Sequence, residues 1–252
     1  EIDRLLCSLD GTENKSRLGA NAILSVSIAA ARAAANWYHV PLYRYLGGAS
    51  AERLPIPMMT ILNGGAHASN NVEIQEFMIV PIGAASFTEA LRIGSEIYHS
   101  LGRILRNEGH ASTVGDEGGY APKVKDGNNE PLECIKYAVD KTRYEFGKDI
   151  AIAMDIAASE FYDQDHYALK TNGDWKSADD LINWYTWIID NYPVVSIEDG
   201  LAENDWANWK IMTERLGDRI QLVGDDLFVT NVKLLDYEII DNKIKLNFNR
   251  IV

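Results

Sequence analysis

Three short apolar runs in the second half of the chain each end abruptly in acidic residues. The runs are residues 150–154, 194–197 and 220–223, and the acids that follow them are Asp155, Glu198-Asp199 and Asp225-Asp226. Short runs rich in Ile, Val and Ala and bounded by polar residues are typical of strands that are buried on both faces. Segments of helical length separate the runs, so the pattern predicts strand–helix–strand units with parallel strands.

The rest of the chain also divides into elements by its apolar pattern. Helical spacing of apolar residues predicts helices over residues 86–106, 131–146, 177–191, 205–216 and 231–241. Two strands, residues 58–62 and 73–81, flank a polar loop and are expected to pair antiparallel. A small hairpin is expected within residues 161–170, and residues 243–252 alternate as a strand does.

The first fifty residues have a different character. Residues 1–18 are polar and rich in turn formers, and an alanine-rich helix follows over residues 19–37. The apolar surface of this helix extends nearly all round, which predicts burial against other helices. A short helix opens at Pro41 and stops at Gly47-Gly48. We therefore expect a helical domain over residues 1–50 and a second, larger domain over residues 51–252.

The predicted fold class of the larger domain is α/β. A sheet that keeps adding parallel strands with outer helices either stays open or closes into a (β/α) barrel, and reactive groups belong on the C-terminal edge in both cases. No glycine-rich phosphate motif follows a first strand, which disfavours a nucleotide-binding fold.

The acids at the strand ends are the first chemical candidates. If the strands are parallel, Asp155, Glu198 and Asp225 converge at one edge of the sheet. Like charges held close repel unless a cation lies among them, and oxygen-only ligands suit Mg²⁺ before Zn²⁺. An Asp after a strand is often only the N-cap of the next helix, but three acids at the same structural point favour a metal site.

Three further residues stand in unusual surroundings. Glu117 lies between Asp116 and two glycines; crowding by Asp116 and Glu76 would make it retain a proton to donate, although it could be an ordinary solvated turn acid. His67, in a glycine-flanked loop, is either a surface histidine or a substrate contact. Glu76 lies within an apolar strand, so it either faces solvent by alternation or has a partner.

Composition limits the classes of partner. The chain has 252 residues and a formal charge of −13, which disfavours nucleic acid and anionic membranes but not an anionic substrate neutralised by a metal ion. Two cysteines, Cys7 and Cys134, show no metal or redox spacing and indicate reduced thiols in a cytoplasmic protein. We see no signal peptide or membrane-spanning run. The first and last residues, Glu1 and Val252, give the impression of a chain cut at both ends.

Several motifs together resemble the enolase family (phosphopyruvate hydratase). They are Leu9-Asp10-Gly11-Thr12-Glu13-Asn14-Lys15-Ser16, Leu62-Asn63-Gly64-Gly65-Ala66-His67, Ile74-Gln75-Glu76-Phe77-Met78, Val114-Gly115-Asp116-Glu117-Gly118-Gly119-Tyr120-Ala121-Pro122, Ser196-Ile197-Glu198-Asp199-Gly200 and Leu222-Val223-Gly224-Asp225-Asp226-Leu227-Phe228. The likeness runs in register from about Leu5 to Leu235. It implies an enolase-type barrel, incomplete here, preceded by the helical end of an N-terminal α+β capping domain.

The resemblance also implies an activity and a set of roles. The expected reaction is the reversible, Mg²⁺-dependent dehydration of 2-phosphoglycerate to phosphoenolpyruvate in glycolysis and gluconeogenesis, by a cytoplasmic homodimer or higher homo-oligomer. By this likeness Asp155, Glu198 and Asp225 hold the first Mg²⁺. Glu117 corresponds to the general acid, Glu76 to its acidic neighbour and His67 to a histidine on the substrate side.

The chain also departs from the family pattern. The N-terminal sheet with its serine-bearing loop, and the later strands with a His, an Arg-Ser pair and a second Lys, are not in this sequence. The family's catalytic lysine falls at Lys245 by local pattern, but an ungapped count points near Arg250, and arginine cannot act as a base at neutral pH. The base is therefore unassigned.

These departures keep two alternatives open. If the polypeptide ends here, the barrel cannot close, and we expect weak or absent turnover. One alternative is then a truncated, non-catalytic enolase-like protein with a binding or scaffold role. The other is a different metal-dependent barrel enzyme, such as a racemase of the same superfamily, which the Gly-Asp-Glu-Gly-Gly and Asn-Gly-Gly-Ala-His motifs disfavour.

Overall fold

A computed structural model describes residues 1–110, 113–169, 174–231 and 233–235. The chain divides into two compact units, Glu1–Leu54 and Pro55–Val252. The helices predicted over residues 86–106, 177–191 and 205–216 are confirmed to within a residue or two. The helix predicted over residues 231–241 and the strand predicted over residues 243–252 lie largely or wholly outside the described residues.

The first unit consists of the helices α1 (Ile2–Asp10), α2 (Ala20–Trp37) and α3 (Leu42–Gly47) and a single 3₁₀ turn, η1 (Gly48–Ser50). Residues 1–18, described from the sequence as polar and rich in turn formers, contain the helix α1, which that description did not predict. Ile2, Leu5 and Leu9 recur at helical spacing, and Gly11 ends the helix in a left-handed conformation with its N–H bonded to the carbonyl of Cys7.

Helix α2 has the predicted position but not the predicted burial. Only Ile23 and Ala35 of this helix are buried, whereas Leu24 and Val26 are at least half exposed. The reason lies in the unit itself, in which two short helices are too small to cover all sides of an eighteen-residue helix.

The second unit is built on one five-stranded sheet. Its order is β1-β2-β3-β7-β8, and the strands are Met59–Asn63, Glu76–Val80, Ala151–Asp155, Val194–Glu198 and Gln221–Val223. Strands β1 and β2 pair antiparallel, as predicted, and so do β2 and β3. The three acid-ended strands β3, β7 and β8 are parallel, which confirms the central prediction of the sequence pattern. Among the described residues the sheet remains open, so the fold is an incomplete (β/α) barrel.

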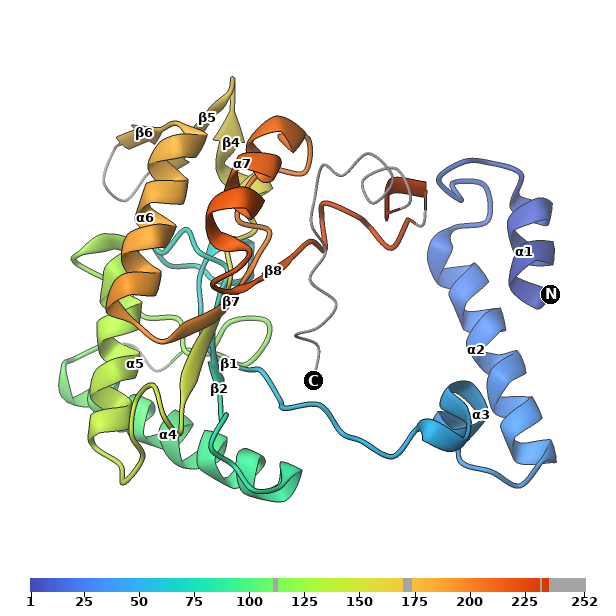
Figure 1. The fold of residues 1–252 in the computed structure, drawn as a ribbon, viewed down its shortest axis with the longest axis horizontal. Helices are drawn as coiled ribbons and strands as arrows, with labels where there is room; N and C mark the ends of the chain where they lie inside the picture. The colour runs from blue at the N-terminus through green and yellow to red at the C-terminus, as the bar shows by residue number, and fades with distance from the viewer. Residues whose placement is uncertain (111–112, 170–173, 232, 236–252) are drawn as a thin grey trace. The chain divides into compact units, whose positions relative to one another are not determined.

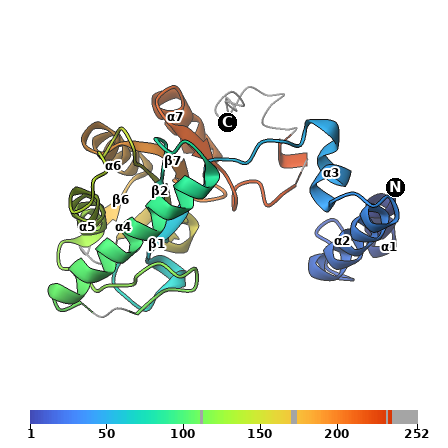
Figure 2. The ribbon, with the colours of Figure 1, turned by 90° about the horizontal axis from the view of Figure 1, so that it is seen from below.

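Four helices lie around the outside of this sheet, as Figures 1 and 2 show. They are α4 (Phe87–Asn107), α5 (Glu130–Asp140), α6 (Ala178–Asn191) and α7 (Trp206–Leu216); a 3₁₀ turn, η3 (Gly127–Asn129), leads into α5. Helix α5 ends six residues earlier than predicted. Ser177 caps α6 with a reciprocal pair of hydrogen bonds to Asp180, which fixes where that helix begins.

A second, smaller sheet follows β3. After the 3₁₀ turn η4 (Ala158–Phe161), the strands β4 (Tyr162–Asp163), β5 (His166–Leu169) and β6 (Asp174–Lys176) pair in sequence order, all antiparallel. The predicted hairpin is therefore confirmed, and β6 extends it.

Side-chain alternation gives the large sheet two different faces. Phe77, Ile79 and Met154 point to the main core beneath the helices. Met78 and Ala153, among others, form a separate small cluster, which lies on the opposite face because side chains alternate along a strand. Glu76 and Asp155 fall in phase with this second set. The acids of the strand ends therefore belong to the face that the helices leave uncovered.

Candidate active site

A row of carboxylates crosses one edge of the large sheet. In the strand register Glu76 of β2 lies opposite Asp155 of β3, and Asp155 lies opposite Glu198 of β7. Glu198 in turn lies opposite Val223 of β8, two residues before Asp225. Since β2 runs antiparallel to β3, the start of one strand and the ends of the others meet at the same edge.

Within this row Asp155, Glu198 and Asp199 form a compact group. Each offers a carboxylate oxygen, and these oxygens all lie within 4.8 Å of one another. Burial and the neighbouring carboxylates raise the pKa of Glu198 to about 7. Burial likewise raises the pKa of Asp155 to about 6, partly offset by a hydrogen bond from Gln75. Raised pKa values mean that the negative charges lack compensation from the protein. An oxygen-only set of this kind fits a hard divalent cation.

Two contacts hold Asp155 in place. Gln75 Nε2 donates to Asp155 Oδ2 at 2.9 Å, and the backbone N–H of Ala157 donates to Oδ1 at 3.1 Å. Asp155 is buried, so these bonds fix its orientation at the sheet edge. In the sequence Gln75 stands out only as part of the motif Ile74-Gln75-Glu76-Phe77-Met78, and its proximity to Asp155 depends on strand register that the sequence did not specify.

Asp225 lies beside this group rather than among its three closest members. Its side chain is exposed, and its charge contributes to the raised pKa of Glu198. Asp199 is the acid that the sequence analysis left without a role. Its carboxylate accepts hydrogen bonds from the backbone N–H groups of Asp225 and Asp226 at 3.1 and 2.8 Å. Its position directly after Glu198 in the sequence was the feature that could have indicated a role for Asp199 in the site.

A second group brings together His67, Glu76 and Glu117. His67 belongs to the 3₁₀ turn η2 (Gly65–His67), and its Nδ1 lies 3.9 Å from Glu76 Oε1 and 3.7 Å from Glu117 Oε1. This nitrogen is buried and has no hydrogen-bond partner among the described residues. Glu76 is held from the other side by Thr60 Oγ1, which donates to its Oε2 at 2.5 Å. Residues from three different segments of the chain thus share one site.

The protonation of Glu117 follows from this proximity. A hydrogen bond with Glu76, followed by burial and the charges of Glu76 and Asp155, raises the pKa of Glu117 to about 7. Asp116, the neighbour singled out in the sequence, makes the smallest contribution. A carboxyl group with this pKa carries a proton for a substantial fraction of the time at neutral pH, as a general acid requires. Asp155 also links the two groups electrostatically, so they form one continuous acidic site.

Asn63, at the end of β1, joins the loops that carry these residues. It is fully buried; its Oδ1 accepts from the N–H of Gly119 at 2.9 Å, and its Nδ2 donates to the carbonyl of Gln75 at 3.3 Å. The backbone adds a link, since Asp116 N–H donates to the carbonyl of His67 at 3.0 Å. A Cβ atom at Gly119 would lie 2.7 Å from Asn63 Oδ1, so only glycine permits this approach. The loop of Glu117 is thereby tied to the loop of His67.

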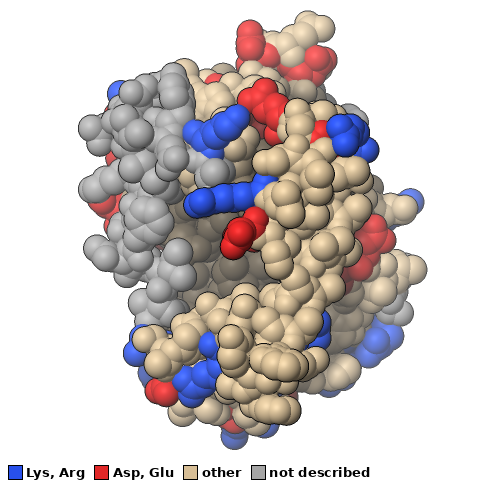
Figure 3. Space-filling view, turned by 90° about the vertical axis from the view of Figure 1, so that its right-hand side faces the viewer, with Lys and Arg blue, Asp and Glu red and all other residues tan. Residues whose placement is uncertain are grey.

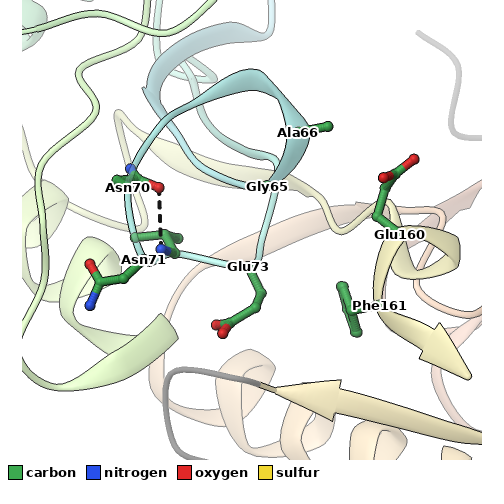
Figure 4. A pocket seen from close by; sticks show the side chains of 8 residues that line it. Gly65, Ala66, Asn70, Asn71, Glu73, Glu160 and Phe161 are labelled. Atoms are coloured by element: carbon green, nitrogen blue, oxygen red, sulfur yellow. Dashed lines mark hydrogen bonds between the residues drawn. The ribbon is translucent and has the colours of Figure 1, made fainter.

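A pocket of about 440 Å³ lies next to the 3₁₀ turn η2, which also carries His67 (Figure 4). It is lined by Gly65 and Ala66, by residues 70–73, and by Glu160 and Phe161 of η4. Figure 4 shows that the carboxylates of Glu73 and Glu160 come from opposite sides of this pocket. The lining contains none of the six site residues predicted from the sequence.

On the face shown in Figure 3, basic and acidic side chains are interspersed and most of the surface is neither. No helix among the described residues is both long and apolar enough to span a bilayer.

Two protein-family models match the chain, one after the other. The enolase N-terminal domain matches residues 1–46, and the enolase C-terminal TIM barrel domain matches residues 51–251. The second match covers most of the chain and includes every residue of both acidic groups.

Proposed function

The chain belongs to the enolase family, and on that premise we propose that it interconverts 2-phosphoglycerate and phosphoenolpyruvate with Mg²⁺. The observation that carries this proposal is the joining of the two acidic groups at one sheet edge. One group fits a divalent cation, and the other contains a carboxyl group whose pKa is raised to about 7. Elimination of water next to a carboxylate needs both functions in the same place.

Asp155, Glu198 and Asp225 are the proposed Mg²⁺ ligands. The α proton of a carboxylate is very weakly acidic, and its removal leaves additional negative charge on the substrate. A bound Mg²⁺ would stabilise this negative charge on the substrate. The protein contributes the placement: Gln75 and the Ala157 N–H orient Asp155, and the strand register sets Glu198 beside it.

Glu117 is the proposed general acid. As the hydroxyl group leaves, Glu117 donates the proton that completes a water molecule, and Glu76 keeps that proton on Glu117 beforehand through their shared hydrogen bond. His67 faces the same space with its buried Nδ1, and we assign it to contact with the substrate. The α proton goes to a base that we leave unassigned, because Lys245 and Arg250 lie outside the described residues.

The proposal also covers the domains, the substrate class, the cellular setting and the oligomeric state. We assign residues 1–50 to the helical part of an N-terminal capping domain and residues 51–252 to the catalytic domain. The proposed substrate is small, anionic and phosphorylated, and the proposed setting is glycolysis in the cytoplasm, as a homodimer or higher homo-oligomer. Nucleic acid is not a proposed partner.

The test is an assay of the purified chain with 2-phosphoglycerate, followed by the ultraviolet absorbance of the enol phosphate product. Product that forms with Mg²⁺, disappears with a chelator and is lost in the Glu117→Gln variant supports the proposal. Formation of product by Glu117→Gln at the unaltered rate contradicts the assignment of the acid.

A second candidate function uses the same carboxylate group without the dehydration. The candidate is a non-catalytic enolase-like protein with a binding or scaffold role. Mg²⁺ binding at Asp155 and Glu198 without any turnover of 2-phosphoglycerate would select it.

A further inference from the structure

We propose that Asp199 is a positioning residue, which holds the turn after β8 so that Asp225 faces the cation shared with Asp155 and Glu198. The inference rests on the metal site of the proposed function and deepens it. It assigns a task to a buried acid that is adjacent to a proposed ligand but different from it.

The carboxylate of Asp199 is bonded to one turn through both of its oxygens. Oδ1 accepts from Asp225 N–H at 3.1 Å, and Oδ2 accepts from Asp226 N–H at 2.8 Å. Since Asp199 is only 3% exposed, these bonds are shielded from water, and each charge-assisted bond is stronger than a neutral one.

Backbone hydrogen bonds connect Asp199 to two other segments of the chain. Its N–H donates to the carbonyl of Val223 at 3.0 Å, and its carbonyl accepts from Ala158 N–H at 3.0 Å. The residue also has a left-handed φ of 44°, a conformation that Asp tolerates better than most residues. One residue therefore connects the chain segments that follow β3, β7 and β8, which are the three strands that carry the proposed ligands.

A different role for Asp199, as a metal ligand itself, must be distinguished. One of its oxygens lies within 4.8 Å of oxygens from Asp155 and Glu198. The hydrogen bonds of Asp155 come from Gln75 and Ala157, but both oxygens of Asp199 accept from the backbone of the turn that carries Asp225. Asp225 itself is exposed at the same sheet edge. This division gives Asp199 the task of orientation and Asp225 the task of ligation.

The experiment measures Mn²⁺, a paramagnetic substitute for Mg²⁺, bound to the full chain by electron paramagnetic resonance of the free ion. Asp199→Asn keeps the size of the side chain and its tolerance of a left-handed backbone but loses the charge and one acceptor. We expect Mn²⁺ to bind ~10-fold or more weakly to this variant, the range found when residues that orient metal ligands are replaced. Asp226→Asn is the matched control. It removes a charge from the same turn but keeps the backbone N–H that donates to Asp199, so it should weaken Mn²⁺ binding much less.

A double-mutant cycle separates orientation from ligation. If Asp199 acts through Asp225, then Asp199→Asn should have little further effect in an Asp225→Asn background. Independent, multiplying losses of Mn²⁺ affinity would make Asp199 a ligand and overturn the proposal. Binding of Mn²⁺ to Asp199→Asn as tightly as to the unaltered chain would also overturn it, while leaving the metal site of the proposed function intact. Failure of the unaltered chain to bind Mn²⁺ overturns both.

A measurement on the unaltered chain covers the case in which Asp199→Asn does not fold. Hydrogen exchange of the metal-free chain should be slow at the amides of Asp225 and Asp226, because each is bonded to a buried carboxylate. If the amides of Asp225 and Asp226 exchange as fast as those of an unstructured loop, Asp199 does not fix the turn and the proposal is refuted.

Discussion

Replacing Glu198 with Gln should stabilise the metal-free protein while removing its affinity for Mg²⁺. Glu198 is partly buried among other carboxylates. Burial, and then the charges of those neighbours, raise its pKa from 4.5 to about 7. Above pH 7 the folded chain must hold this carboxyl group ionised in an unfavourable place. The neutral amide of Gln has nearly the same shape and avoids that penalty.

The magnitude follows from the displaced pKa. One pKa unit corresponds to ~1.4 kcal/mol, so the displacement of Glu198 is equivalent to ~3 kcal/mol at most. Between pH 4.5 and about 7 the folded chain binds a proton that the unfolded chain has released, so stability falls as pH rises through this window. At about pH 8 we therefore expect Glu198→Gln to raise the free energy of unfolding by ~1–3 kcal/mol, or the melting temperature by ~3–10 °C.

The assay is thermal or urea unfolding of both chains in a chelator, at about pH 5 and about pH 8. The difference should shrink to less than ~1 kcal/mol at the lower pH, where folded Glu198 is already neutral. Glu203→Gln, at an exposed acid on the loop after β7, is the control and should shift stability by less than ~0.5 kcal/mol. Excess Mg²⁺ should reverse the order by stabilising only the unaltered chain. Loss of stability in Glu198→Gln at about pH 8 without metal would refute the reasoning.

Three further predictions concern other parts of the molecule. Glu117→Gln should lower turnover of 2-phosphoglycerate at least ~100-fold with Mg²⁺ affinity retained, and in the unaltered chain turnover should fall above pH 7 as Glu117 loses its proton; a flat pH profile would count against the acid role. Gly119→Ala should destabilise the protein by ~1–3 kcal/mol in urea unfolding, because the new Cβ would lie 2.7 Å from Asn63 Oδ1; unchanged stability would contradict this packing. Ser177→Ala should lower stability by ~1 kcal/mol through loss of the α6 cap and leave Mg²⁺ affinity unchanged, and a change in affinity would show that the cap influences the site.

The parallel core of the fold could be predicted because its signal is local and repeated. Each of β3, β7 and β8 is a short apolar run that ends in an acid, and right-handed crossover connections leave little freedom in how such runs are arranged. Helix α1 was missed for a complementary reason. Its apolar residues recur at helical spacing, but polar neighbours obscured them, and the left-handed conformation of Gly11 that ends the helix is visible only in the structure.

Some contacts of the candidate site could likewise be predicted from the sequence, and others could not. Asp155 and Glu198 end adjacent parallel strands, so their proximity follows from topology alone. The meeting of His67 with Glu117 depends on Asn63 and on a backbone bond between two loops, and no periodicity in the sequence encodes it. The task of Asp199 was equally hidden, because hydrogen bonds to a turn twenty-six residues away depend on how two loops pack.

The central claim is that the carboxylates at one sheet edge share a single divalent ion. Calorimetric titration of the metal-free chain with Mg²⁺ at about pH 8, where these groups are ionised, tests it most directly. We predict one bound Mg²⁺ per chain and loss of that binding in both Asp155→Asn and Glu198→Gln. Binding of Mg²⁺ to both variants with the affinity of the unaltered chain would contradict the account.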